Sequence, residues 1–184
     1  MNKQSNLYRL LISAVLLALG MVLPLLTGQI PAIGQAISPL HIPALICGLT
    51  CGPVWGAAMS FVLPLLRSAV FGMPPLVAVA LPMAFELAAY GAVSGVLYRI
   101  FRRMRKEKNH LLPLLAALVL AMIAGRLVGG AAKAIVMGLT GGSFGFQMFI
   151  ASYFTSTAIG AVIHIVLVPA VVTALERAKL SPMG

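Results

Sequence analysis

The sequence predicts an all-α membrane protein with six transmembrane helices and with both termini in the cytoplasm. Hydrophobic residues make up 61% of the 184 positions and charged residues only 9%, and the mean hydropathy is +1.05, values that indicate an integral membrane protein. The apolar stretches are long and do not alternate with polar residues, which favours helices over barrel strands. Most cations flank these stretches, as expected at membrane boundaries. We therefore expect a single membrane domain over residues 1–184.

The first three spans are apolar runs separated by residues that break helices. The first, at about residues 7–26, is too long for the core of a signal peptide, so we interpret it as a retained span. A loop rich in glycine and proline leads to the second, at about 40–51, which is short for a crossing and which we expect to be tilted or sheltered by its neighbours. The pair Gly52-Pro53 then separates it from the third span, at about 54–71.

The last three spans follow a turn that no helix can continue. Pro74 and Pro75 remove two backbone donors, so the fourth span begins after them and runs over about 76–100. A dense basic run follows it. The fifth span covers about 111–139, and after a glycine-rich turn the sixth covers about 146–175.

The positive-inside rule gives a consistent orientation. If the amino terminus is cytoplasmic, the basic run after the fourth span and the tail with Arg177 and Lys179 are cytoplasmic too. The outward connections, at 28–39, 72–75 and 140–145, then contain no charged residue. Such loops are typical of pocket walls, and also of short connections in any compact membrane protein. Orientation and contact with anionic lipids explain the net charge of +10 better than a nucleic-acid partner does.

Four charged residues lie inside the apolar stretches, away from their cytoplasmic ends: Arg67, Glu86, Arg126 and Lys133. An ionised side chain at the centre of a membrane helix costs roughly 2.5–3.5 kcal/mol on insertion scales, which indicates a function for those that are kept. Arg67 and Lys133 fall in the outer half of the membrane. Arg126 precedes Lys133 by two helical turns, so both project from nearly the same face. Glu86, near mid-depth, is the natural partner of Arg126 or of Arg67.

Each of these charges also has a structural interpretation. Glu86 and Arg126 could form a buried clamp between helices as readily as a ligand site. Arg67 and Lys133 have no obvious acidic partner, because the chain contains no Asp and its other glutamates belong to the cytoplasmic face. Snorkelling to the outer headgroups competes with ligand binding for Lys133.

Other residues near the outer surface complete the predicted binding site: His41, which opens the second span, Phe71 and Gln147. His164, in the sixth span, is interpreted as a hydrogen-bonded core residue. The first span carries Ala14 and Ala18, a spacing that lets another helix approach closely. Such pairs also arise by chance in alanine-rich spans, and the chain has others, at 84–88 and at 91–95.

These features resemble the substrate-binding S components of energy-coupling factor (ECF) transporters. The resemblance rests on the six hydrophobic segments, the short second helix, the small-residue pair in the first, and the basic loop after the fourth. Four strings look like those of the group that includes riboflavin and pantothenate carriers: HIPALICG at 41–48, LPLLRS at 63–68, FGMPP at 71–75 and AFELA at 84–88.

The resemblance implies a transport subunit of a prokaryotic cytoplasmic membrane, rather than an enzyme. Such a protein captures a vitamin or similar micronutrient from outside. It docks through Ala14 and Ala18 onto a transmembrane coupling protein driven by two cytoplasmic ATPases. The chain has no phosphate-binding loop motif, so we assign ATP hydrolysis to those partners, and we expect no cofactor and no metal. The excess of intramembrane cations favours a small anionic vitamin such as pantothenate or nicotinate, and the few aromatic residues disfavour riboflavin.

Two other classes of protein remain as alternatives. A stand-alone proton-coupled transporter would need a titrating carboxylate, which Glu86 could supply, and usually an internal repeat, which we do not find. An intramembrane enzyme is less favoured, because the sequence shows no paired acids, no metal-ligand motif and no nucleophile with a neighbouring base.

Overall fold

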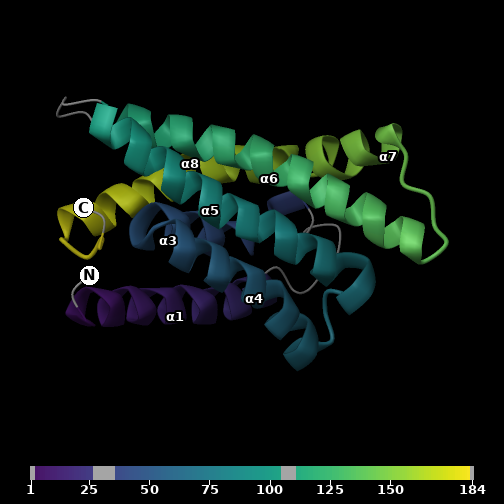
Figure 1. Ribbon diagram of the computed structural model, residues 1–184, viewed down its shortest axis with the longest axis horizontal. Helices are drawn as coiled ribbons and strands as arrows, with labels where there is room; N and C mark the ends of the chain where they lie inside the picture. Colours follow the sequence, from purple (N-terminus) through teal and green to yellow (C-terminus); the bar gives the residue numbers. More distant parts are fainter. Residues whose placement is uncertain (1–2, 27–35, 105–110, 183–184) are drawn as a thin grey trace.

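The computed structural model describes residues 3–26, 36–104 and 111–182, and every regular element in them is helical. The predicted outward connection at 28–39 therefore lies largely outside the described residues, as do the last cations of the basic run, at 105–108. The helices are arranged as a bundle (Figure 1). In chain order the elements are α1 (Lys3–Leu26), α3 (His41–Cys51), α4 (Pro53–Phe71), the π-helical turn η1 (Leu76–Ala80), α5 (Leu81–Met104), α6 (Leu111–Leu139), α7 (Phe146–Ile150), the π-helical turn η2 (Ala151–Thr155) and α8 (Ala158–Arg177).

Five stretches of helix are long and apolar enough to cross a membrane: Ser5–Leu25, Pro53–Phe71, Leu76–Met104, Leu111–Leu139 and Ala158–Arg177. They match five of the six predicted spans. The remaining one is α3, an apolar helix of 11 residues. At 1.5 Å per residue it is about 16 Å long, roughly half of the ~30 Å hydrocarbon core. A sixth crossing and cytoplasmic termini stay predictions.

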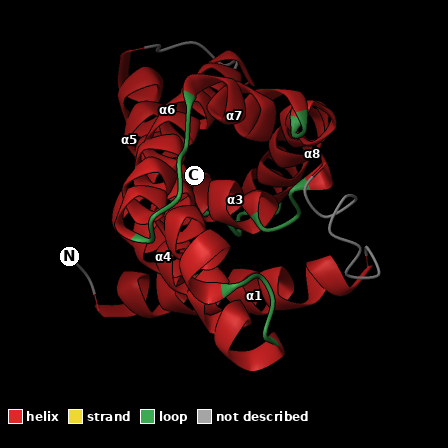
Figure 2. Cartoon of the chain, turned by 90° about the vertical axis from the view of Figure 1, so that its right-hand side faces the viewer, coloured by secondary structure: helices red, strands yellow, loops and turns green. Residues whose placement is uncertain are grey.

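Helix α3 lies at the centre of the bundle (Figure 2). All eleven of its residues are buried, and it contacts α1, α4, α5 and α8. The sheltering expected for a short second helix is therefore confirmed. Because α3 meets protein on every side, its neighbours rather than lipid determine which residues it can carry.

Glycines bring the backbones of α3, α4 and α5 into direct contact. A methyl group on Gly91 of α5 would collide with backbone atoms of Gly56 in α4, and one on Gly48 of α3 would collide with the backbone of Gly91. A methyl group on Gly95 would lie 2.6 Å from the Pro53 nitrogen, at the start of α4. The pair Gly91 and Gly95, whose spacing alone is weak evidence, thus serves close helix packing.

The fourth and sixth predicted spans differ from the structure: the fourth in its boundaries, and the sixth because it is divided. The fourth begins with η1, and α5 continues to Met104 rather than ending near residue 100. The sixth is divided, because α8 starts only at Ala158, after α7 and η2. At this break Thr157 donates its hydroxyl to the Tyr153 carbonyl and Ser156 to the Ser152 carbonyl. Hydroxyl groups that bond back to the preceding turn in this way often bend helices.

Helix α1 lies at one side of the bundle, against α3 and α4. Its Ser13, Leu16 and Gly20 are buried, whereas Ala14 and Ala18 are exposed. Near its start, the Tyr8 hydroxyl donates to the Leu180 carbonyl at 3.0 Å. Towards its other end, the Met21 carbonyl accepts a hydrogen bond from Arg67 of α4. The small-residue pair therefore faces away from the rest of the chain.

Candidate functional site

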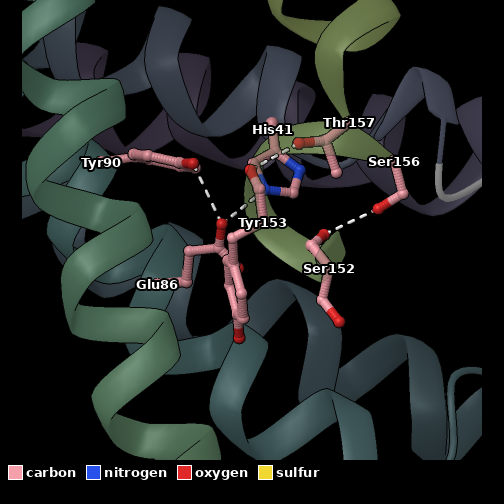
Figure 3. Close-up of polar contacts among 7 residues, drawn as sticks. All are labelled: His41, Glu86, Tyr90, Ser152, Tyr153, Ser156 and Thr157. Carbon is pink, nitrogen blue, oxygen red and sulfur yellow. Dashed lines mark hydrogen bonds and ion pairs between the residues drawn. The ribbon is translucent and has the colours of Figure 1, made fainter. Parts of the chain in front are cut away.

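Glu86 pairs with a histidine and a tyrosine, so the prediction that an arginine is its partner is wrong. Its Oε1 lies 3.2 Å from His41 Nε2 and 3.0 Å from the Tyr90 hydroxyl (Figure 3). Tyr90 follows Glu86 by one helical turn on α5, so the two share a face. His41 is the first residue of α3, and both it and Glu86 are only 6% exposed. The short α3 therefore begins inside the bundle, and the prediction that His41 lies at the outer side of the membrane stays a prediction.

A second histidine joins this network. The ring of His164, on α8, stacks on that of His41 with centroids 5.7 Å apart and an interplanar angle of 18°. Neither His41 Nδ1 nor His164 Nε2 has a hydrogen-bond partner, although both atoms are buried. The two residues are far apart in sequence. The one sequence signal for their contact is that each is an ionisable residue within an apolar stretch, where such residues are rare and usually pair with one another.

Helix α6 packs against the network at Gly129, next to Glu86. A methyl group on Gly129 would lie 2.8 Å from Glu86 Cβ and 3.0 Å from the Tyr153 ring. Arg126 precedes Gly129 by about one turn of α6 and interacts electrostatically with the Tyr90 hydroxyl. Its guanidinium carbon lies 5.2 Å from the centre of the Phe154 ring. Arg126 is therefore beside the Glu86 network without being its ion-pair partner.

Lys133 is connected to the same region through aromatic rings. Its ammonium lies 5.8 Å from the centre of the Phe144 ring. Phe144 contacts the buried Tyr153, with centroids 6.5 Å apart, and Tyr153 also contacts Phe149 at 5.5 Å. A cation over a ring face keeps its charge while it loses water, and the contact contributes about 0.5–2 kcal/mol.

An apolar groove of about 340 Å³ lies between α6 and residues 144–149. Its lining consists of Leu127, Gly130, Ala131, Ala134, Phe144, Gly145, Phe146 and Phe149. Gly130 allows the ring of Phe149 to lie against α6, since a methyl group there would overlap that ring. None of the charged residues predicted from the sequence lines the groove.

Arg67 lies apart from these residues, between α4 and α1. Its side chain donates to the Met21 carbonyl of α1, and its guanidinium carbon lies 5.0 Å from the Phe71 ring centre. Arg67 is 3% exposed, whereas Phe71 is 39% exposed. Gln147, on α7, is exposed. Substrate contact by Arg67, Phe71 and Gln147 stays a prediction.

Replacing Arg67 with methionine is expected to loosen α1 and to lower the free energy of unfolding by about 1.5–3 kcal/mol, the usual contribution of a charged hydrogen bond. The change leaves the Met21 carbonyl without this donor. Thermal unfolding of the detergent-purified variant measures the effect, with Arg126→Met as the matched control because Arg126 has no bond to α1. An unchanged midpoint in Arg67→Met, together with lost ligand binding, would make Arg67 a substrate contact only.

The arrangement can hold a charged polar molecule. The acid–base contacts within the described residues are His41 with Glu86 and Arg102 with Glu176, so neither Arg126 nor Lys133 is within ion-pair distance of a described acid. No group of three or more His, Cys, Asp or Glu side chains within the described ranges could hold a metal ion. A network with two unpaired ring nitrogens next to Arg126 can bind hydrogen-bonding groups of a ligand.

Comparison with known proteins gives one match. The chain matches the family model of the ECF transporter substrate-specific component over residues 8–176, nearly its whole length. No curated protein and no solved structure matches it. The match agrees with the all-helical bundle and with the apolar helices of crossing length. The chain therefore belongs to the family of substrate-specific components of ECF transporters.

Proposed function

We propose that this protein captures a small anionic vitamin, such as pantothenate or nicotinate, at the outer half of the membrane for ATP-driven import. The observation that carries the proposal is the excess positive charge on α6, where Arg126 lies beside the buried network of His41, Glu86 and Tyr90 and Lys133 follows Arg126 by two helical turns. Arg126 and Lys133 supply this charge, and neither is paired with an acid in the described part of the chain.

The chemistry of these cations favours a carboxylate. Arg126 presents a planar fork that matches two carboxylate oxygens, and Lys133 adds a compact point charge. Both are half-buried, where screening by water and salt is weaker than at a free surface. We also include Arg67, Phe71 and Gln147 as substrate contacts in the proposal. Arg67 would contact the substrate from its position between α4 and α1, away from the network of His41, Glu86 and Tyr90.

The positions of the basic residues support the proposed orientation. At one end of the bundle, Arg102 of α5 lies 4.0 Å from Glu176 of α8, which also accepts a hydrogen bond from Tyr98 at 2.7 Å. The bond from Tyr8 to Leu180 brings the start of α1 to the end of α8. The start of α1, the end of α5 with Arg102 and the end of α8 thus lie on one side, which we assign to the cytoplasm.

The exposed pair Ala14 and Ala18 supports docking onto a partner helix. Small residues allow close approach of two helix backbones in a membrane, where van der Waals contact rather than the hydrophobic effect drives association. We propose that this face of α1 binds the transmembrane coupling protein of an ECF module, whose two ATPases supply the energy.

Substituting Arg126 or Lys133 with alanine is expected to weaken pantothenate binding about 10–100-fold, the equivalent of one hydrogen bond to a charged group. Titration calorimetry on the detergent-purified chain measures the dissociation constant. Arg177→Ala, which removes a cation at the opposite end, serves as the control and should bind like the wild type. Full affinity in both Arg126→Ala and Lys133→Ala would rule out an anion site at these residues.

A further inference from the structure

The stacked pair His41 and His164 leaves two hydrogen-bonding atoms unused in the interior. The residues are only 6% and 3% exposed, yet His41 Nδ1 and His164 Nε2 have no partner. Nine in ten or more buried polar groups in folded proteins are paired. Two unpaired nitrogens on adjoining rings, next to the proposed cation site, therefore indicate a group that the chain itself does not supply.

Glu86 determines which nitrogen of His41 carries the proton. Glu86 Oε1 accepts from the Tyr90 hydroxyl and lies 3.2 Å from His41 Nε2. Because the same oxygen already accepts from Tyr90, we assign it as the acceptor towards His41 too, which places the His41 proton on Nε2. In the neutral ring the free Nδ1 is then a hydrogen-bond acceptor.

The backbone before α3 determines the tautomer of His164 in the same way. His164 lies against the backbone of Ser38 and Ile37, whose interaction with the ring favours a proton on it. Because Nε2 has no partner, we assign this proton to Nδ1. The free Nε2 is therefore a second acceptor. The two acceptors belong to rings whose centroids are 5.7 Å apart, close enough for donors a few bonds apart in one small molecule.

We propose that His41 and His164 form a subsite that binds hydrogen-bond donors of the substrate, hydroxyl or amide N–H groups, while the cations hold its acid group. This inference rests on the proposed function and narrows its substrate class. The substrate is an aliphatic acid that carries hydroxyl or amide donors away from its carboxylate. Pantothenate, with two hydroxyls and an amide N–H, has this chemistry. Nicotinate, which has no donor when ionised, does not.

Four conservative variants separate the ligand-facing nitrogens from the structural ones. The amide of Gln reaches the position of a histidine Nε2, and the amide of Asn reaches that of Nδ1. His41→Gln and His164→Asn thus keep the bonds within the protein and remove the free nitrogens. His41→Asn and His164→Gln do the reverse, keeping an acceptor for the ligand and losing the internal bond.

The experiment compares pantothenate with its analogue lacking both hydroxyls, by titration calorimetry on the purified full-length chain. We expect the wild type to prefer pantothenate about 10–100-fold, because the analogue leaves a buried acceptor unpaired. In His41→Gln and His164→Asn this preference should fall to nearly one, with an unchanged melting temperature of the ligand-free protein. His41→Asn and His164→Gln should retain the preference and melt earlier.

The outcomes distinguish this subsite from the proposed function. Equal affinity of the wild type for pantothenate and its analogue, or tighter binding of nicotinate, overturns the donor subsite and leaves the anion site intact. A lower melting temperature of His41→Gln and His164→Asn with unchanged preference also overturns it, because the nitrogens would then bind structural water. A wild type that binds none of the three acids overturns the proposed function and the subsite together.

Discussion

Gly91→Ala is expected to destabilise the protein by about 3 kcal/mol, the upper part of the usual range for overpacking. The added methyl group would collide with the backbone of Gly56, which cannot rotate away as a side chain can. Helices α4 and α5 must then separate, and the neighbouring contacts at Gly48 and Gly95 loosen with them. Thermal unfolding of the purified variant in detergent measures the loss.

Gly138→Ala is the matched control for this substitution. Gly138 is also inside a helix, but a methyl group there would meet no atom within 4 Å. Alanine is favoured over glycine in helix interiors by about 1 kcal/mol, so this variant should melt at the same temperature as the wild type or higher. Equal stability of Gly91→Ala and Gly138→Ala would mean that the backbones of α4 and α5 are not in contact.

Enlarging both Ala14 and Ala18 to tryptophan is expected to reduce vitamin uptake by cells at least about tenfold while purified protein binds its ligand normally. Both alanines are exposed, so the larger rings would disturb no contact within the chain. They would keep a partner helix from the close approach that small residues allow. Uptake of labelled pantothenate by cells that contain the ECF module, together with co-purification of the coupling protein, measures the effect.

Val166→Trp is the control for this pair of substitutions. Val166 is 68% exposed on α8, so a ring there also extends from a crossing helix, on a different face of the bundle. We expect normal uptake and normal co-purification. Unimpaired uptake in the double tryptophan variant would remove Ala14 and Ala18 from the docking surface and would require another face of the chain for the partner.

The helices were the most predictable part of this molecule. The fifth predicted span, 111–139, agrees with α6 at both ends, because a long and mostly apolar stretch between breakers leaves little choice of boundary. The division of the sixth span was not predicted, since it depends on the hydroxyls of Ser156 and Thr157 bonding back to the preceding turn. Such bonds compete with the helix only in particular surroundings.

The candidate site was less predictable, because its contacts join separate helices. The ring under Arg67 is Phe71, four residues later on the same helix, and this contact could have been read from the spacing. Phe154 and Phe144, which lie under Arg126 and Lys133, come from beyond the end of α6. The charge of Glu86 suggested an arginine as its partner, whereas its partners are a tyrosine and a histidine.

The short central helix has a consequence for how the protein enters the membrane. A helix of eleven residues is too short to be inserted as an independent span, and the first residue of α3 is a histidine. Its place against the backbones of α4 and α5 exists only once these longer helices are in the bilayer. We therefore expect biogenesis in two stages, in which the long helices integrate first and α3 settles between them, so that His41 meets Glu86 last.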